Sequence, residues 1–401
     1  MKLAMVLPGG VDRSGERRVI PAVLALLARL AAEHELHVFT LLQEREPATW
    51  QLLGAQVHNI GARRTLSRAL AAIAAEHRRN PFHAVLSIFS GPAGLTAGLA
   101  ARYLRIPGLV HVTGGELVAL PQIAYGGRLT WKGRLREAIV LRLATQVSTS
   151  SEPMVQQLTR LGIAAQRIAL GVDLRRWPVC PPRKRNAVPR LIQVASLNRV
   201  KHPALVLAAL QEMRTAGAEF HMDFVGEDTL QGELQALTRQ LGLARQVRFH
   251  GFLTQRELYP LMLQADLMLV SSWHEAGPFA VLEAAVVGVP TVGTDVGHIA
   301  EWAPAAACVV PQADPAALAR STLALLSDDD RRLKLAAEAQ RRAIAENADY
   351  TANSFSQLLA RLAADRTSEG PSGLTRGISR LRPLRAKRSS GRATLHRSPR
   401  P

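Results

Sequence analysis

Two glutamates, Glu275 and Glu283, stand eight positions apart in the segment Ser271–Thr294. The apolar run before this segment is typical of a buried strand. Gly277 allows close approach of the backbone, and Pro278 suits the first turn of a helix. Because the first amides of a helix attract anions, this order predicts an anion site with a carboxylate on either side.

The helix that follows is expected over Phe279–Val287, with Glu283 one turn from its start and Gly288 after its end. A diphosphate at the helix start would then lie between the two carboxylates. A ribose diol at Glu283 and a sugar at Glu275 fit that placement. The backbone predicted to bind such a donor belongs to Gly277, Pro278, Phe279 and Ala280.

Short apolar strands alternate with longer helical periods on both sides of a linker rich in Pro, Arg and Lys. Alternation of this kind predicts parallel sheets with helices on both faces. We expect an α/β protein of two Rossmann-like, doubly wound domains that face a central cleft. The expected elements include strands at Lys2–Leu7 and Leu267–Val270 and a first helix at Glu16–Glu33.

The predicted organisation has five parts. An acceptor-side domain is followed by a linker and a donor domain, then by a helix that packs back on the first domain and by a disordered basic tail. Their boundaries are 1–173, 174–189, 190–346, 347–365 and 366–401.

Positive charge is concentrated in two of these parts. Residues 1–173 carry a net charge of +9, residues 174–365 are balanced, and residues 366–401 carry another +9. The segment Gly126–Arg142 mixes Trp131 and leucines with five basic residues. It is either a basic amphipathic helix on an anionic membrane or a solvated basic helix of the first domain. The tail is a second candidate for contact with anionic lipid.

Other classes of protein are disfavoured. Cys180 and Cys308 form no CxxC pair, which fits a reducing cytosol. The apolar stretches are too short for a signal peptide or a membrane span, so we expect a cytoplasmic protein, peripheral on the inner face of the membrane if it contacts lipid. Neither half has a GxGxxG after its first strand, no P-loop occurs, and no nucleic-acid-binding module is present, so no nucleic-acid partner is expected.

The spacing of Glu275 and Glu283, with Gly277 and the following Gly-Val-Pro, resembles the E-x7-E signature of family-4 retaining glycosyltransferases of GT-B fold. The resemblance covers about residues 1–364. Further matching segments are the glycine-rich loop Pro8–Arg18, Ser148–Ser151, Leu170–Asp173, Ser196–Asn198 with Lys201, Val225–Asp228 and Phe249–Phe252.

The resemblance implies roles for the matching residues. Glu283 would hydrogen-bond the ribose hydroxyls of a nucleotide diphosphate sugar, and Glu275 would contact the hydroxyls of the donor sugar. Lys201, helped by Arg199, would neutralise the diphosphate leaving group. The remaining donor-binding positions would be Ser196 in the phosphate-contacting loop, Gly226 and Gly251 beside base and ribose, and Gly15 in the loop that closes on the phosphates.

Members of this family resemble one another in needing no metal, since positive side chains and a helix dipole replace it. The resemblance therefore implies no cofactor beyond the donor, and transfer with retention of the anomeric configuration by front-face internal return.

Two positions depart from the family pattern. Ser196 stands where an arginine is usual, and Arg199 is the expected substitute. The family's His-Gly acceptor motif appears here as Thr113–Glu116, without the histidine. Glu116 and Gly115 are the candidate acceptor contacts.

We therefore expect a metal-independent hexosyltransferase that acts on a hydroxyl acceptor in cell-surface polysaccharide or glycolipid synthesis. The positive first domain favours an anionic or lipid-linked acceptor. The alternatives are a nucleotide-sugar epimerase of the same fold and a nucleotide-sugar-binding protein without turnover.

Overall fold

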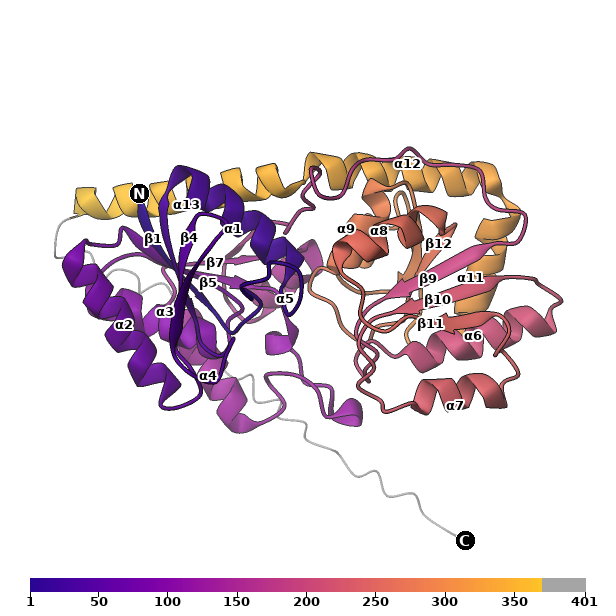
Figure 1. Ribbon diagram of the computed structural model, residues 1–401, viewed down its shortest axis with the longest axis horizontal. Helices are drawn as coiled ribbons and strands as arrows, with labels where there is room; N and C mark the ends of the chain where they lie inside the picture. Colours follow the sequence, from indigo (N-terminus) through magenta and orange to yellow (C-terminus); the bar gives the residue numbers. More distant parts are fainter. Residues whose placement is uncertain (370–401) are drawn as a thin grey trace, which may run out of the picture.

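The computed structural model describes residues 1–369 and consists of two α/β domains (Figure 1). The first contains an eight-stranded sheet in which every neighbouring pair is parallel except β3 and β4. In spatial order its strands are β3 (Ala48–Leu52), β4 (Ala55–Asn59), β2 (Glu35–Thr40), β1 (Lys2–Leu7), β5 (Ala84–Ile88), β6 (Gly108–Val112), β7 (Gln146–Thr149) and β8 (Ala165–Arg167).

The second domain contains a six-stranded sheet in which all the pairs are parallel. In spatial order its strands are β11 (Val247–Phe249), β10 (His221–Val225), β9 (Arg190–Val194), β12 (Leu267–Val270), β13 (Thr291–Thr294) and β14 (Cys308–Val310). The two doubly wound sheets confirm the predicted fold class. The antiparallel edge strand β3 was not predicted.

Helices cover both faces of each sheet, because alternate side chains of a buried strand point to opposite faces. In β1, Leu3, Met5 and Leu7 join one apolar core with α1, while Ala4 and Val6 join another with α2 and α3. The helices of the first domain are α1 (Pro21–Glu33), α2 (Thr65–Arg79), α3 (Pro92–Leu104), α4 (Trp131–Leu143) and α5 (Glu152–Arg160), with short 3₁₀ turns at Gly115–Leu117 and Pro121–Ile123.

In the second domain, α6 and α11 pack on one face of the sheet, and α8 and α9 pack on the other. Its helices are α6 (Pro203–Thr215), α7 (Glu233–Gln240), α8 (Gln255–Gln264), α9 (Phe279–Val286), α10 (Gly297–Trp302), α11 (Pro315–Ser327) and α12 (Asp329–Ala345).

The strand order reverses between β1 and β5 in the first sheet and between β9 and β12 in the second. Loops that leave neighbouring strands in opposite directions open a crevice at the carboxyl ends of those strands. The loops that follow these four strands carry Gly15, Phe89, Lys201 and Glu275. The topology therefore brings the predicted donor loops to one edge of each sheet.

The first helix begins later than the sequence predicted. The expected start was Glu16, but α1 begins at Pro21. Val11 and Val19 form an isolated bridge, and the Ile20 amide donates to the Gly10 carbonyl at 3.0 Å. These hydrogen bonds fold the glycine-rich segment into a loop, because they use backbone groups that a helix would need for its own hydrogen bonds.

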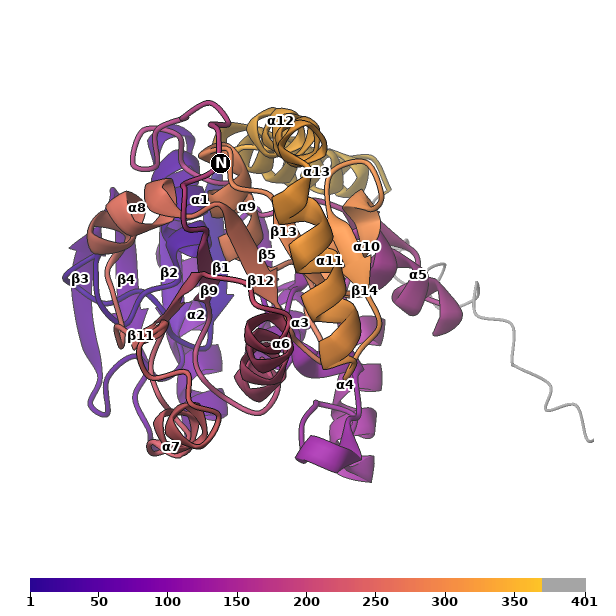
Figure 2. The ribbon, with the colours of Figure 1, turned by 90° about the vertical axis from the view of Figure 1, so that its right-hand side faces the viewer.

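The last helix, α13 (Ala348–Glu369), returns to the first domain. Both views show α12 and α13 along the same edge of the molecule (Figures 1 and 2). Phe355, Leu358 and Leu359 of α13 lie in the core that contains β1 and α1. Gly171 is required at the crossing, because a Cβ there would lie 2.0 Å from the Glu346 carbonyl oxygen. The chain therefore ties the two domains together twice.

The expected boundary of this helix was residue 365, and α13 continues to Glu369. The rest of the predicted basic tail, residues 370–401, lies outside the described residues. Within residues 1–369, none of the helices has the length and apolar character that crossing a membrane requires.

Replacing Phe355 by alanine tests the return of α13. The side chain is fully buried, so the change removes apolar contacts and leaves a cavity in the first domain. We expect the free energy of unfolding to fall by about 3–5 kcal/mol in denaturant titrations. Gln357→Ala, on the exposed side of the same helix, should change it by less than about 0.5 kcal/mol. Equal values for the two variants would contradict the packing described here.

Candidate functional site

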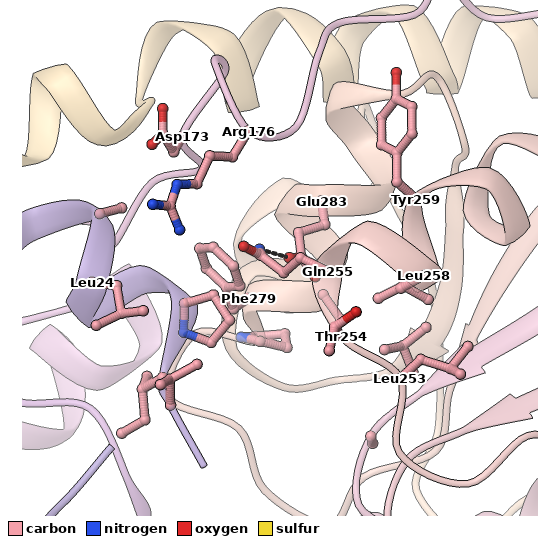
Figure 3. A pocket seen from close by; sticks show the side chains of 18 of the residues that line it. Leu24, Asp173, Arg176, Leu253, Thr254, Gln255, Leu258, Tyr259, Phe279 and Glu283 are labelled. Carbon is pink, nitrogen blue, oxygen red and sulfur yellow. Dashed lines mark hydrogen bonds between the residues drawn. The ribbon is translucent and has the colours of Figure 1, made fainter. Parts of the chain in front are cut away.

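A cavity of about 1180 Å³ lies between the domains at the carboxyl ends of both sheets (Figure 3). Both domains contribute to its lining. The predicted site residues on it are Gly15, Ser196, Lys201, Glu275, Pro278, Phe279, Ala280 and Glu283. The structure thus brings most of the predicted donor-binding residues together around one space.

One carboxylate oxygen of Glu275 accepts two hydrogen bonds. Its Oε1 accepts from Lys201 Nζ at 2.5 Å and from Ser272 Oγ at 2.6 Å. The two loops are also joined by the Trp273 amide, which donates to the Val200 carbonyl at 2.8 Å. An ammonium and a carboxylate are therefore held side by side in the cavity wall.

Glu283 lies one turn into α9 and is only 3% exposed. Gln255 Nε2 donates to its Oε1 at 2.7 Å, as the dashed line in Figure 3 shows. Burial raises the pKa of Glu283 to about 7, although the hydrogen bond from Gln255 opposes the shift. A carboxylate removed from water in this way is a strong acceptor for hydroxyl groups that enter the cavity.

The start of α9 faces the same cavity through Pro278, Phe279 and Ala280. The first amides of a helix have no acceptor within it, so they favour an anion. Gly277 also has a packing role that was not predicted, and its contact with the donor remains a prediction. A Cβ there would lie 2.7 Å from Ser150 Cβ and 3.0 Å from His298 Nε2, so this glycine allows the domains to touch.

Three further predicted donor residues are absent from the cavity lining. Arg199 is exposed to solvent. At Gly226 a Cβ would lie 1.9 Å from the Ala195 carbonyl oxygen, which explains the glycine by packing of the backbone. Gly251 has a positive φ of 68° and open space around it. Their roles in binding remain predictions.

The candidate acceptor residues Gly115 and Glu116 also lie off the cavity lining. A Cβ at Gly115 would lie 2.3 Å from the Tyr125 hydroxyl oxygen. Glu116 Oε1 accepts from the Ser90 amide at 3.0 Å, which ties the loop after β6 to the loop after β5. Burial raises the pKa of Glu116. Its carboxyl group supports the loop, and its contact with an acceptor remains a prediction.

A second buried carboxyl group, that of Glu137 on α4, lies near Glu116. Glu137 is 1% exposed, and neither of its oxygens makes a hydrogen bond of normal geometry among the described residues. Burial raises its pKa to about 7. The nearby Ser90 hydroxyl opposes this shift, and the charge of Glu116 adds to it.

Sequence reasoning missed several residues at the cavity and its rim. Gln255 has no motif, because its partner Glu283 is 28 positions away. His274 Nε2 is 3.2 Å from the Gly114 carbonyl oxygen and joins the two domains beside Glu275. Arg176 lies three positions after Asp173, the last residue of the matching segment Leu170–Asp173, and both residues line the cavity. The position of Arg176 soon after this segment was the only feature of the sequence that could have indicated its place at the cavity.

One group of possible metal ligands lies elsewhere. Glu35, His37 and Glu76 gather at the amino ends of the first-domain strands, on the opposite edge from the cavity. Lys2 Nζ lies 3.1 Å from Glu35 Oε1 and 2.7 Å from Glu76 Oε1. The lysine therefore supplies the positive charge at that cluster.

Comparisons with known proteins match both halves of the chain. Residues 19–171 match the family model described as "Glycosyl transferase 4-like domain". Residues 181–342 match the model described as "Glycosyl transferases group 1". The chain is 30% identical over 179 residues to a glycogen synthase of Mycobacterium tuberculosis, and the match covers 44% of this chain and 43% of that protein.

Solved structures share the fold over nearly the whole chain. Sucrose-phosphate synthase from Thermosynechococcus elongatus gives a TM-score of 0.75 at 18% identity, over 91% of this chain and 100% of that one. The Anabaena protein Alr3699/HepE, in complex with UDP and glucose, gives 0.70 at 15% identity, over 90% and 100%. Both show that this arrangement of two domains is similar to theirs.

The buried carboxyl group of Glu137 predicts a pH-dependent stability. Its pKa in the folded protein, about 7, lies above the ordinary value of 4.5. The stabilising contribution is therefore complete below about pH 4.5 and is lost as the pH rises through 7. At 1.36 kcal/mol per pKa unit the loss is about 3 kcal/mol. The unfolding free energy of the wild type should therefore fall between pH 5 and pH 8. In Glu137→Gln this contribution to the fall should be absent.

The matched control is Glu212→Gln, at an exposed position on α6, which should keep the wild-type dependence on pH. An unchanged dependence in Glu137→Gln would show that this carboxyl group is ionised in the folded protein at pH 5.

Proposed function

Because the chain belongs to the group 1 glycosyltransferases of GT-B fold, we propose that it transfers a sugar from a nucleotide diphosphate sugar to a hydroxyl acceptor. The observation that carries this proposal is the convergence of Lys201, Glu275, Glu283 and the start of α9 on one cavity. The product we propose belongs to a cell-surface polysaccharide or a glycolipid.

The chemistry of the lining supports one arrangement of the donor. The carboxyl group of Glu283 accepts hydrogen bonds from the ribose hydroxyls, and Gln255 holds it in position. The diphosphate lies at the first amides of α9. The sugar then extends toward Glu275, whose second oxygen is available to its hydroxyls. The complexes of Alr3699/HepE with UDP and with UDP-glucose support this class of ligand.

Transfer breaks the bond between the anomeric carbon and the diphosphate and forms a bond from that carbon to the acceptor oxygen. We propose attack on the same face, so that the anomeric configuration is retained. The acceptor proton passes to an oxygen of the leaving diphosphate. Lys201 and the dipole of α9 stabilise the negative charge that develops on the diphosphate, and this charge compensation makes a metal unnecessary.

Glu275→Gln tests this reaction. We expect transfer from the preferred nucleotide sugar to fall by at least about 100-fold, because the change disturbs both the sugar contact and the Lys201 ion pair. Affinity for the nucleoside diphosphate should fall by no more than about threefold, since Glu283, α9 and the charge of Lys201 are all retained. Glu233→Gln, exposed on α7, serves as the matched control.

The products of the same assay separate the alternatives. An epimerase releases free sugar and nucleotide without an acceptor. A binding protein without turnover binds the donor but converts none of it across a broad acceptor panel. Either result in the wild-type protein would contradict the proposed transfer.

We also propose that α4 rests on an anionic membrane that holds the acceptor. Trp131, Leu135 and Ile139 follow one another at four-residue spacing and are 63%, 52% and 39% exposed. Exposed Lys132, Arg134 and Arg142 surround this apolar stripe. An apolar stripe bordered by cations is suited to the interface of a bilayer with negatively charged lipids.

The double variant Trp131→Ser, Leu135→Ser should reduce co-sedimentation with vesicles that contain phosphatidylglycerol by about tenfold. Activity on a soluble acceptor should not change, because the stripe lies away from the cavity. Leu66→Ser, at an exposed apolar position on α2, is the matched control. Equal vesicle binding by the double variant and the wild type would contradict the membrane contact.

A further inference from the structure

Arg176 lies in the connection between the two domains and lines the donor cavity. In Figure 3 its guanidinium points into the space between Leu24 of α1 and Phe279, the first residue of α9. The side chain thus approaches the start of α9 from the side of the first domain.

The guanidinium of Arg176 makes no hydrogen bond or ion pair with any residue in the described part of the chain. The nearby carboxylate of Asp173 is bonded elsewhere. Its Oδ1 accepts from Arg29 Nη2 at 2.9 Å and from the Arg175 amide at 3.1 Å. Arg176 and Asp173 do attract each other. Burial raises the pKa of Asp173, but the hydrogen bonds from Arg29 and from the Arg175 amide and the charge of Arg29 lower it, and the charge of Arg176 makes a smaller contribution in the same direction.

The other cations of the cavity differ from Arg176. Lys201 is paired with Glu275. Arg256 lines the cavity from α8, beside the exposed Glu257. Among the residues that Figure 3 labels, Arg176 is the one cation, and its guanidinium points toward Phe279 at the start of α9.

A cation beside the start of a helix is electrostatically unfavourable unless an anion lies between them. The planar guanidinium group is well suited to that anion, because it can donate two parallel hydrogen bonds to a phosphate group. The geometry of Arg176 thus supplies a second positive group for the diphosphate, in addition to Lys201.

We propose that Arg176 binds the diphosphate of the donor, an inference that rests on the proposed function. It takes the role that the resemblance assigned to Arg199. Both side chains are exposed, but Arg176 lines the cavity and Arg199 does not. Ser196 leaves the β9 loop without a cation at that position, and the connection after Asp173 supplies one instead. Arg176 belongs to the connection between the domains, which contacts α1 through Asp173 and α9 through Trp177, so the bound diphosphate would also join this connection to α9.

The test compares affinities for ligands with and without phosphate. UDP, GDP, ADP and dTDP are first titrated into the wild-type protein by calorimetry, and the tightest of them and its parent nucleoside are then measured with each variant. Arg176→Ala should weaken the diphosphate by about 10–100-fold, since a charge-assisted hydrogen bond contributes about 1.5–3 kcal/mol. Affinity for the nucleoside should stay within twofold, and Arg176→Lys should recover part of the loss.

Arg175→Ala and Arg199→Ala are the matched controls, because both side chains are exposed and neither lines the cavity. Each should change the diphosphate affinity by less than about threefold. An unaffected diphosphate affinity in Arg176→Ala, or an equal loss for diphosphate and nucleoside, would overturn the inference. A large loss in Arg199→Ala would restore the assignment made from the sequence. If the wild type binds none of the four diphosphates, the proposed function itself fails.

Discussion

Parallel pairing constrains this molecule more than any other interaction. It places the carboxyl ends of all the strands of a sheet at one edge, except where β3 runs antiparallel at the rim. At the two reversals of strand order, neighbouring loops must diverge and leave a crevice. The residues with chemical function therefore come from distant parts of the sequence. Lys201 and Glu275 are 74 positions apart and meet because β9 and β12 are neighbours.

The electrostatics of the cleft follow from burial at this edge. Glu283 is removed from water at a carboxyl end of the second sheet, so it gains from any hydroxyl donor that enters. The amino end of α9, a few residues before Glu283, carries the partial positive charge of the helix dipole. A ligand with a diol beside a diphosphate satisfies both at once. The helix α13, packed back on β1 and α1, holds the facing domain in place across the cavity.

The sequence was sufficient for what depends on local patterns. Apolar runs of strand length and glycine and proline at element ends predicted the two parallel sheets, and the spacing from Glu275 to Glu283 placed both on one cavity. It failed where tertiary contacts decide. The start of α1 moved to Pro21 because a bridge between Val11 and Val19 competes with the helix. Periodicity also cannot distinguish Arg176, which lines the cavity, from Arg199, which is equally exposed but lies off the lining; the binding role of Arg199 stays a prediction. Gln255, which donates the hydrogen bond to Glu283, comes from another helix.

A crystal structure of the protein with the nucleoside diphosphate it binds most tightly tests most directly whether the cavity is a donor site. We expect the ribose hydroxyls within hydrogen-bonding distance of the Glu283 carboxyl group. We expect the diphosphate at the amides of Phe279 and Ala280. A nucleotide bound elsewhere, or in this cavity with its phosphates turned away from α9, would contradict the donor site proposed here.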